Sequence, residues 1–214
     1  MEEKEFGFLR ETKEEAIKAG IDKEIGLKRT GLDEYLKVIF PNIDDWVHDK
    51  EIPNIYFNGK KYRGRPDYRS EKLKMIIEFD GLPHYQNPDI IIKDEEKNII
   101  YEEEGYKVVR IPYFIQLTNT VIKRLFNVEI EREMFPELVP SLGIEGRCTP
   151  AYLCPMGIRR MAWNFLELAP EQLMVNIGYL ELKEREQEDN QFKTGLYYLL
   201  DEIEEVERII ENDE

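Results

Sequence analysis

The chain has little cysteine and no long hydrophobic run. Its 214 residues include only two cysteines, Cys148 and Cys154. Two cysteines cannot build a disulfide framework, and a zinc site would need two further ligands beside them. No apolar stretch approaches the length of a membrane span, and the opening MEEKEFGFLRETKEE does not resemble a signal peptide. These absences favour reduced cysteines and a soluble, cytoplasmic protein.

The chain is rich in charge, and the charge is unevenly distributed. A hydrophobic fraction of 42% and a charged fraction of 35% fit a globular protein with a sizeable core. The net charge of −15 argues against a protein that simply coats nucleic acid. However, residues 1–125 carry 22 Lys and Arg against 25 Asp and Glu, whereas residues 126–214 carry 8 against 20. The excess of negative charge therefore lies mainly in the C-terminal part.

One short segment of the first part is strongly basic. Between positions 60 and 74, seven basic residues stand against only two acidic ones. Basic side chains could contact phosphates, and such binding would weaken steeply with salt. A solvated, charged hairpin would show the same pattern, so both interpretations stay open. The candidate DNA-binding residues are Lys60, Lys61, Arg63, Arg65, Arg69 and Lys72.

The hydrophobic pattern predicts a mixed α/β core followed by helices. We expect a helix at 9–18 and a second helix from Thr30 to about residue 41. A hairpin at 55–62 that turns at Asn58-Gly59 should follow, and then strands at 62–69 and 73–79. The core should end with a helix from Pro88 to Gly105, a strand at 106–111 and a helix at 120–126. The prolines after Asn127 suggest loops, and two acidic helices follow at about 171–188 and 192–211. We therefore predict an N-terminal helical segment (1–27), a core (28–130) and an acidic, mainly helical C-terminal region (131–214).

Carboxylates gather at the end of the strongest predicted strand. Side chains two apart on a strand share a face, so Glu78 and Asp80 should point away from the core side chains Ile77 and Phe79. Gly81 permits a sharp turn that could bring His84 back beside them, and Asp67 should arrive from the neighbouring strand. Hard divalent cations such as Mg²⁺ prefer oxygen ligands and keep several waters. The pattern is typical of a metal site, although a solvated strand end would also fit it.

Four motifs in a fixed order carry a resemblance to a known family. They are Arg65-Pro66-Asp67-Tyr68, then Glu78-Phe79-Asp80-Gly81 with His84, then Asp94 with Lys97, then Gly105-Tyr106-Lys107-Val108-Val109-Arg110. Over about residues 28–126 the chain resembles the very-short-patch-repair-like branch of the PD-(D/E)XK nuclease superfamily. The resemblance implies a restriction-endonuclease-like core, in the order helix, three-strand antiparallel unit, helix, strand, helix, with the C-terminal helices appended.

The resemblance also implies a reaction and its residues. It implies hydrolysis of DNA phosphodiester bonds with Mg²⁺, for which Mn²⁺ can substitute. Asp67, Glu78 and Asp80 would hold the metal ion, and His84 would act as general base or leaving-group partner. Glu34, Asp94 and Lys97 would support the site. Because Asp80 stands where most of the superfamily has a lysine, the metal ion and His84 would have to activate the water.

Two other functions remain open from the sequence. A nuclease fold without activity could serve as a nucleic-acid-binding or assembly module. Alternatively, the acidic C-terminal region could be the functional part, as a homodimer contact or a surface for another protein. For an active enzyme, the sequence does not choose between restriction, repair nicking and homing cleavage, in a phage or a mobile element.

Overall fold

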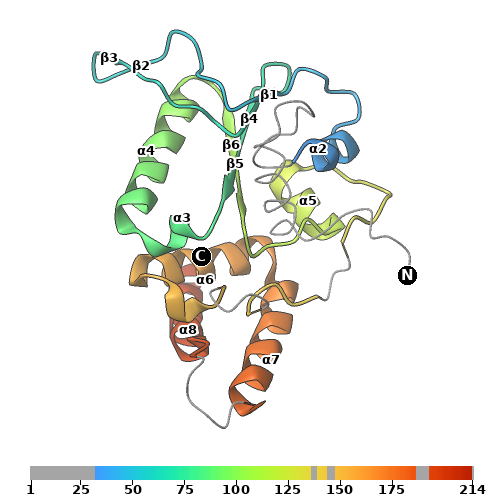
Figure 1. Cartoon of the computed structure of the whole chain (residues 1–214), viewed down its shortest axis with the longest axis vertical. Coiled ribbons are helices and arrows are strands. Elements are labelled where there is room, and N and C mark those ends of the chain that lie inside the picture. The colour runs from blue at the N-terminus through green and yellow to red at the C-terminus, as the bar shows by residue number, and fades with distance from the viewer. Residues whose placement is uncertain (1–31, 136–138, 144–147, 187–192, 214) are drawn as a thin grey trace, which may run out of the picture.

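A four-stranded sheet lies at the centre of the computed structural model, which describes residues 32–135, 139–143, 148–186 and 193–213. The strands are β1 (Val47–His48), β4 (Tyr68–Ser70), β5 (Met75–Asp80) and β6 (Lys107–Pro112), in the order β1-β4-β5-β6. β1, β4 and β5 are antiparallel, and β5 and β6 are parallel (Figure 1). The helix expected at 9–18, the 1–27 segment and the Thr30 cap fall outside the described residues.

Strand β5 is buried along its whole length because helices cover both faces of the sheet. Ile76 packs with Ile100 and Tyr101 of helix α4 (Pro88–Glu103) on one face. Ile77 belongs to the larger hydrophobic cluster on the other face, which includes helices α2 (Asp33–Ile39) and α5 (Asn119–Phe126). Figure 1 shows α4 on one side of the strands, with α2 and α5 on the other. The alternation predicted for this strand is confirmed.

The connection from β5 to β6 follows the predicted pattern. Parallel neighbours need a crossover, and α4 supplies it after the short helix α3 (Pro83–Gln86). Asn87 caps α4 by accepting a hydrogen bond from the Asp89 amide at 2.9 Å, and Pro88 occupies the first turn. Beyond its end, Gly105 adopts φ +82°, which a glycine tolerates without strain. Local sequence signals therefore define both ends of α4.

The three-strand antiparallel unit is built differently from our expectation. The predicted hairpin exists as β2 (Tyr56–Phe57) and β3 (Lys60–Lys61), with positive φ at both Asn58 and Gly59. It forms a separate two-stranded sheet. The third antiparallel strand of the main sheet is instead β1, which pairs with β4 and which we did not predict. A strand of two residues has no hydrophobic alternation by which the sequence could reveal it.

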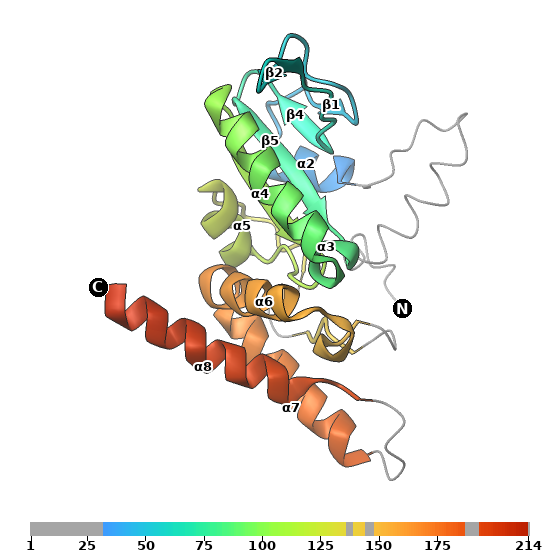
Figure 2. The same ribbon diagram turned by 90° about the vertical axis from the view of Figure 1, so that its left-hand side faces the viewer.

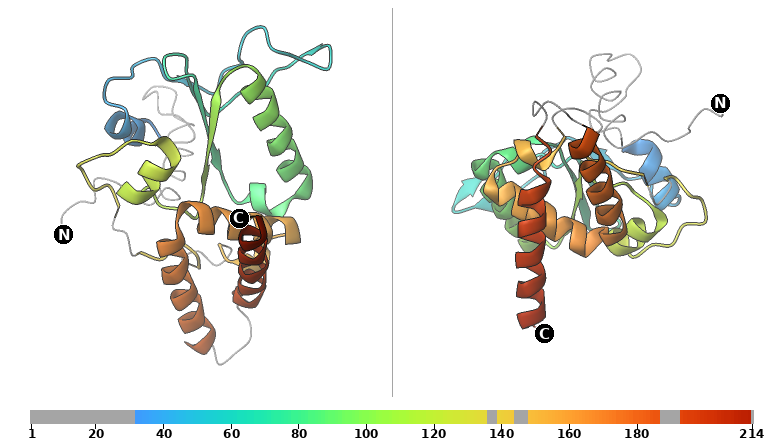
Figure 3. Two further views of the ribbon diagram at one scale, coloured as in Figure 1. Left: turned by 180° about the vertical axis from the view of Figure 1, so that it is seen from behind. Right: turned by 90° about the horizontal axis from the view of Figure 1, so that it is seen from below.

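Three helices follow the core: α6 (Pro155–Leu168), α7 (Pro170–Glu186) and α8 (Leu196–Asp213), preceded by a 3₁₀ turn at Pro150–Tyr152. The last two confirm the acidic helices, and α6 begins at the last proline of the stretch that we expected to contain loops. Pro155 occupies its first turn, where a missing N–H costs nothing. α6 lies against the end of the sheet and α3 (Figure 2), and α7 and α8 lie beyond it (Figure 3).

The C-terminal helices share the hydrophobic core of the sheet rather than forming one of their own. Phe165 of α6 contacts Phe114, which follows β6, with ring centroids 4.7 Å apart. Both belong to the same buried cluster as Ile77. None of the helices in the described ranges is long and apolar enough to cross a membrane.

The contact between α6 and α3 depends on a glycine, which gives a stability prediction. A Cβ atom at Gly157 would lie 1.7 Å from the carbonyl oxygen of Tyr85. Gly157→Ala should therefore force α6 away from α3 and destabilise the protein by about 1–3 kcal/mol. Gly178→Ala on α7 is the matched control, because its Cβ meets nothing within 4 Å. Urea denaturation measures both, and equal stability of the two variants would contradict the packing described.

Candidate functional site

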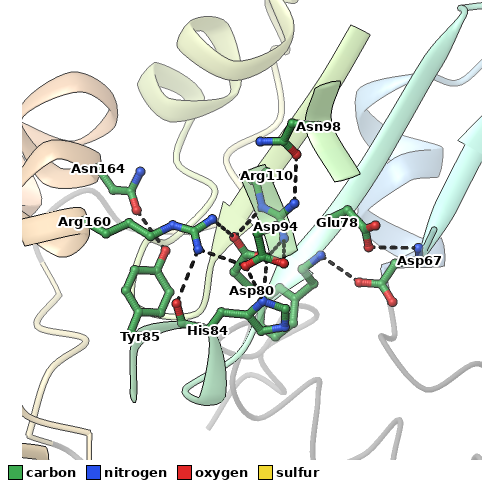
Figure 4. A network of polar contacts seen from close by, with 11 residues as sticks. Asp67, Glu78, Asp80, His84, Tyr85, Asp94, Asn98, Arg110, Arg160 and Asn164 are labelled. Atoms are coloured by element: carbon green, nitrogen blue, oxygen red, sulfur yellow. Dashed lines mark hydrogen bonds and ion pairs between the residues drawn. The ribbon is translucent and has the colours of Figure 1, made fainter. Parts of the chain in front are cut away.

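Two carboxylates, Asp67 and Glu78, meet across strands β4 and β5. The pairing of Tyr68 with Ile77 places Asp67 beside Glu78 on the face that α4 covers. The Asp67 amide donates to Glu78 Oε2 at 3.3 Å, and the Phe79 amide donates to Asp67 Oδ2 at 2.7 Å. Figure 4 shows the two side chains together, at one end of the polar network. We call these two residues the acid pair.

The acid pair is shielded from water without full electrostatic compensation, with Glu78 buried and Asp67 half-buried. Burial, with a smaller contribution from Asp80, raises the pKa of Asp67 to about 6. Burial and then the charge of Asp67 raise the pKa of Glu78 to about 7. Lys97 acts on both carboxylates through space only, and Glu78 Oε1 is buried and has no hydrogen-bond partner among the described residues. The described residues therefore place two acidic groups together with no cation in contact.

The other carboxylates of the site, Asp80 and Asp94, are in the opposite situation, because two arginines hold both. Arg110 donates to Asp80 through Nε at 2.7 Å and Nη2 at 2.5 Å, and its Nη2 lies 2.9 Å from Asp94 Oδ1. Arg160 donates to Asp80 Oδ2 at 3.0 Å and to Asp94 Oδ2 at 2.9 Å. Both carboxylates are only 1% exposed. We call Asp80, His84, Asp94, Arg110 and Arg160 the arginine-bound group (Figure 4).

His84 belongs to this group through its Nδ1 atom, which lies 2.7 Å from Asp94 Oδ2 and 3.5 Å from Asp80. Burial opposes ionisation of Asp94, but the hydrogen bonds from His84 and Arg160 and the charge of Arg110 hold its pKa at about 2. Asp94 is therefore ionised, and its carboxylate oxygens can only accept hydrogen bonds. It follows that His84 Nδ1 carries the hydrogen in this contact.

The arginine-bound group also contains a possible metal site. Ligand atoms of Asp80, His84 and Asp94 lie within 4.8 Å of one another, so this group could bind a metal ion. Its carboxylate oxygens, however, already accept hydrogen bonds from Arg110 and Arg160. A cation entering there would have to displace two guanidinium groups, whereas at the acid pair no guanidinium of the described residues is bound to the carboxylates. The electrostatics therefore favour the acid pair.

The structure divides the ligand set expected from the sequence. Asp67 and Glu78 stay together as predicted, but Asp80 joins His84 and Asp94 instead of completing one three-carboxylate site. Asp94 lies at the centre of its group. Glu34 is not part of either group, because its side chain is 67% exposed and pairs with Lys37 at 2.6 Å. Its neighbour Asp33 is the residue of α2 that reaches inward, accepting a hydrogen bond from Tyr68 at 2.8 Å.

The candidate DNA-binding residues do not form one free surface. Lys60, Lys61 and Arg63 are exposed on and after the hairpin. Arg65 donates to the backbone and carboxylate of Asp49, and Lys72 pairs with Asp44, although both remain about half exposed. Arg69 is buried and lies 3.2 Å from Glu71, so its assignment to DNA binding was wrong.

Sequence reasoning missed the roles of Arg110 and Arg160. Arg110 had a local signal, because it ends the last of the four motifs and pairs in register with Glu78. This places it on the same face of the sheet as the carboxylates. Arg160 had no comparable signal, because it lies 80 positions from Asp80 and outside the four motifs.

Comparison with known proteins adds no assignment. No protein-family model, curated protein or solved structure matches the chain significantly. The resemblance described above therefore rests on the motifs alone.

The raised pKa of Glu78 predicts how stability depends on pH. Because the folded state holds this proton up to about pH 7, whereas an ordinary glutamate loses it near 4.5, deprotonation destabilises the fold as pH rises between these values. At pH 4, Glu78→Gln and the wild type should have the same free energy of unfolding. At pH 8, the metal-free variant should be more stable than the wild type by about 2–3 kcal/mol. Exposed Glu96→Gln is the control. Urea denaturation at several pH values measures the free energy of unfolding of the variant and of the wild type. If the difference between them does not change with pH, Glu78 ionises normally.

Proposed function

We propose that the protein is a metal-dependent DNA endonuclease that hydrolyses phosphodiester bonds, with Mg²⁺ held by Asp67 and Glu78. The observation that carries the proposal is the acid pair itself. One half-buried and one buried carboxylate lie side by side on one face of the sheet, and their pKa values are raised. Within the described ranges, one oxygen of Glu78 has no hydrogen-bond partner. Strongly perturbed acids of this kind are typical of functional sites.

The donor atoms of the acid pair fit a hard divalent cation. Mg²⁺ and Mn²⁺ favour carboxylate oxygens and retain waters, so one or two carboxylates are enough to hold Mg²⁺ beside a phosphate. When bound, the ion would lower the pKa of a water and neutralise charge on the phosphate. Asp67 is kept in position by the Phe79 amide, which leaves its other oxygen for the ion.

Two further residues would serve the reaction. Lys97 of α4 acts on both carboxylates of the acid pair and would place positive charge where the phosphate arrives. His84 is 26% exposed, so its ring is accessible from solvent. Because Asp94 binds its Nδ1, Nε2 is the nitrogen that would exchange a proton with the water or the leaving oxygen.

DNA would approach the acid pair along the exposed basic residues of the hairpin and its continuation. Lys60, Lys61 and Arg63 lie between four and seven positions before Asp67. Their charges contrast with the acidic C-terminal helices. The far side of the molecule would therefore repel DNA and the hairpin side attract it, which orients binding.

One observation favours a second function, an inactive nuclease fold that binds nucleic acid or protein. In the arginine-bound group, Asp80 and Asp94 are compensated by the chain's own arginines rather than by a metal ion. A protein that no longer needs an ion could be stabilised in this way. The acid pair distinguishes the two functions. Arg110 and Arg160 contact Asp80 and Asp94 but neither carboxylate of the acid pair, so this inactive fold would have no reason to keep the acid pair.

The proposal predicts cleavage that depends on the acid pair. With supercoiled plasmid and Mg²⁺ or Mn²⁺, the wild-type protein should produce nicked or linear DNA. Asp67→Asn and Glu78→Gln should lower the rate at least about 100-fold, because the ion contributes several kcal/mol to the transition state. Glu96→Gln should cut like the wild type. Equal residual cutting by all four proteins would indicate a contaminant, and a folded wild type without cutting would favour the inactive module.

The position of the DNA-binding surface makes a separate prediction. Lys60→Ala with Lys61→Ala should weaken binding to DNA of any sequence and lower the slope of log affinity against log salt by as much as about two units. Lys183→Ala with Arg185→Ala removes the same charge from half-buried and exposed positions on α7 and should leave the slope unchanged. Fluorescence anisotropy over a salt series measures both. An equal effect of the two double variants would mean that only net charge matters.

A further inference from the structure

Helix α6 is fixed against α3 by contacts that involve the backbone. The Cys154 amide donates to the Tyr85 carbonyl oxygen at 3.2 Å, and Gly157 lies so close to the same oxygen that no Cβ would fit. The Tyr85 ring is fully buried, and its hydroxyl donates to Asn164 Oδ1 at 2.8 Å. These contacts leave α6 little freedom to shift relative to α3, the helix that carries His84.

Arg160 stands between these contacts and reaches from α6 into the candidate site. Its side chain is only 13% exposed, and its guanidinium carbon lies 5.3 Å from the centre of the Tyr85 ring. Nη2 donates to Asp80, and Nη1 donates both to Asp94 Oδ2 and to the His84 carbonyl oxygen at 3.3 Å. The planar guanidinium thus joins two acids and a backbone oxygen, which a lysine ammonium cannot match in geometry.

The contacts of Arg160 converge on His84. Asp94 Oδ2 accepts from both His84 Nδ1 and Arg160 Nη1, so Arg160 helps to fix the oxygen that orients the imidazole. Through the carbonyl oxygen, Arg160 also holds the backbone from which the ring projects. Asp80 does not need Arg160 for compensation, because Arg110 already donates to both of its oxygens. The distinctive contribution of Arg160 is therefore to the position of His84.

We propose that Arg160 is the positioning residue for His84, and that the C-terminal helical region is thereby a required part of the nuclease centre. The inference rests on the proposed function for its catalytic consequence, but its structural part stands independently. Arg160 does not touch the reacting atoms. It acts through Asp94 and through the backbone of His84, and it comes from a helix outside the four motifs that suggested a nuclease.

The first test observes the histidine directly and needs no activity. The chain has two histidines, so imidazole NMR of the full-length, metal-free protein resolves His84 with His48 of β1 as internal reference. A hydrogen-bonded Nδ1–H that exchanges slowly with water should appear for His84 in the wild type and in Arg159→Ala. It should be lost in Arg160→Ala. Arg159 is the matched control, because it is exposed and pairs with Glu202 of α8 instead.

The second test measures the catalytic consequence with metal and plasmid. Arg160→Ala should lower kcat about 100-fold, as expected when a reacting group is misplaced by about 1 Å, while KM changes less than about threefold. Arg160→Lys should recover part of kcat, because lysine keeps the positive charge but lacks the two planar nitrogens that bind Asp80 and Asp94 together. Arg159→Ala should match the wild type in both constants. Circular dichroism confirms that each variant is folded, and Arg160→Gln, which also removes the charge, serves for both measurements if Arg160→Ala does not fold.

The outcomes separate this inference from the proposed function. A retained His84 signal in the folded Arg160 variant overturns the positioning role, as does a kcat equal to that of Arg159→Ala when the wild type cuts DNA. If the wild type does not cut with any metal, the nuclease proposal fails, and the NMR comparison alone decides the positioning role. Loss of the His84 signal only in the Arg160 variant supports it.

Discussion

The pairing of Asp80 with Arg110 is the interaction on which the rest of the site depends. The two residues lie on neighbouring parallel strands, and both oxygens of the buried carboxylate accept from one guanidinium. A buried carboxylate is costly unless a cation and hydrogen bonds compensate it. Because Arg110, together with Arg160, provides that compensation for Asp80 and Asp94, these two acids do not require a metal ion. The acid pair beside them receives no such contact from the part of the chain that the structure describes.

This division gives the acids of one small region different chemical roles. The arginine-bound group is close to neutral and connects five segments, namely β5, α3, α4, β6 and α6. The acid pair stays protonated to an unusually high pH, and its buried Glu78 Oε1 has no hydrogen-bond partner in the described ranges. Arrangements that cost stability in this way cluster where a protein binds or reacts. The same division explains why the C-terminal helices are part of the core, since the charge balance of the site includes Arg160.

Local signals in the sequence were enough to predict much of this structure. The alternation of β5, the cap and stop of α4 and the Asn58-Gly59 turn depend on neighbours in the chain, and each is present. The proximity of Asp67 and Glu78 followed from strand periodicity and one adjacent strand. What failed depends on distant contacts. The two-residue strand β1 has no pattern of its own and forms only by pairing with β4.

The pairing of acids with arginines was also beyond the sequence. Strand periodicity places Glu78 and Asp80 on one face, but it does not say which of them a cation from another segment will reach. Register with β6 brings Arg110 to the carboxylates, and the docking of α6 adds Arg160 from 80 positions away. Tertiary packing therefore decides which carboxylates are left for an ion, and the expected three-carboxylate site becomes two groups.

The position of a bound ion tests the account most directly. Crystals of the protein soaked with Mn²⁺ would show it by anomalous diffraction, without any assumption about activity. We expect a peak between the carboxylates of Asp67 and Glu78, with Arg110 and Arg160 still bound to Asp80 and Asp94. A peak among Asp80, His84 and Asp94 with the guanidinium groups displaced, or no peak at either group, would contradict it.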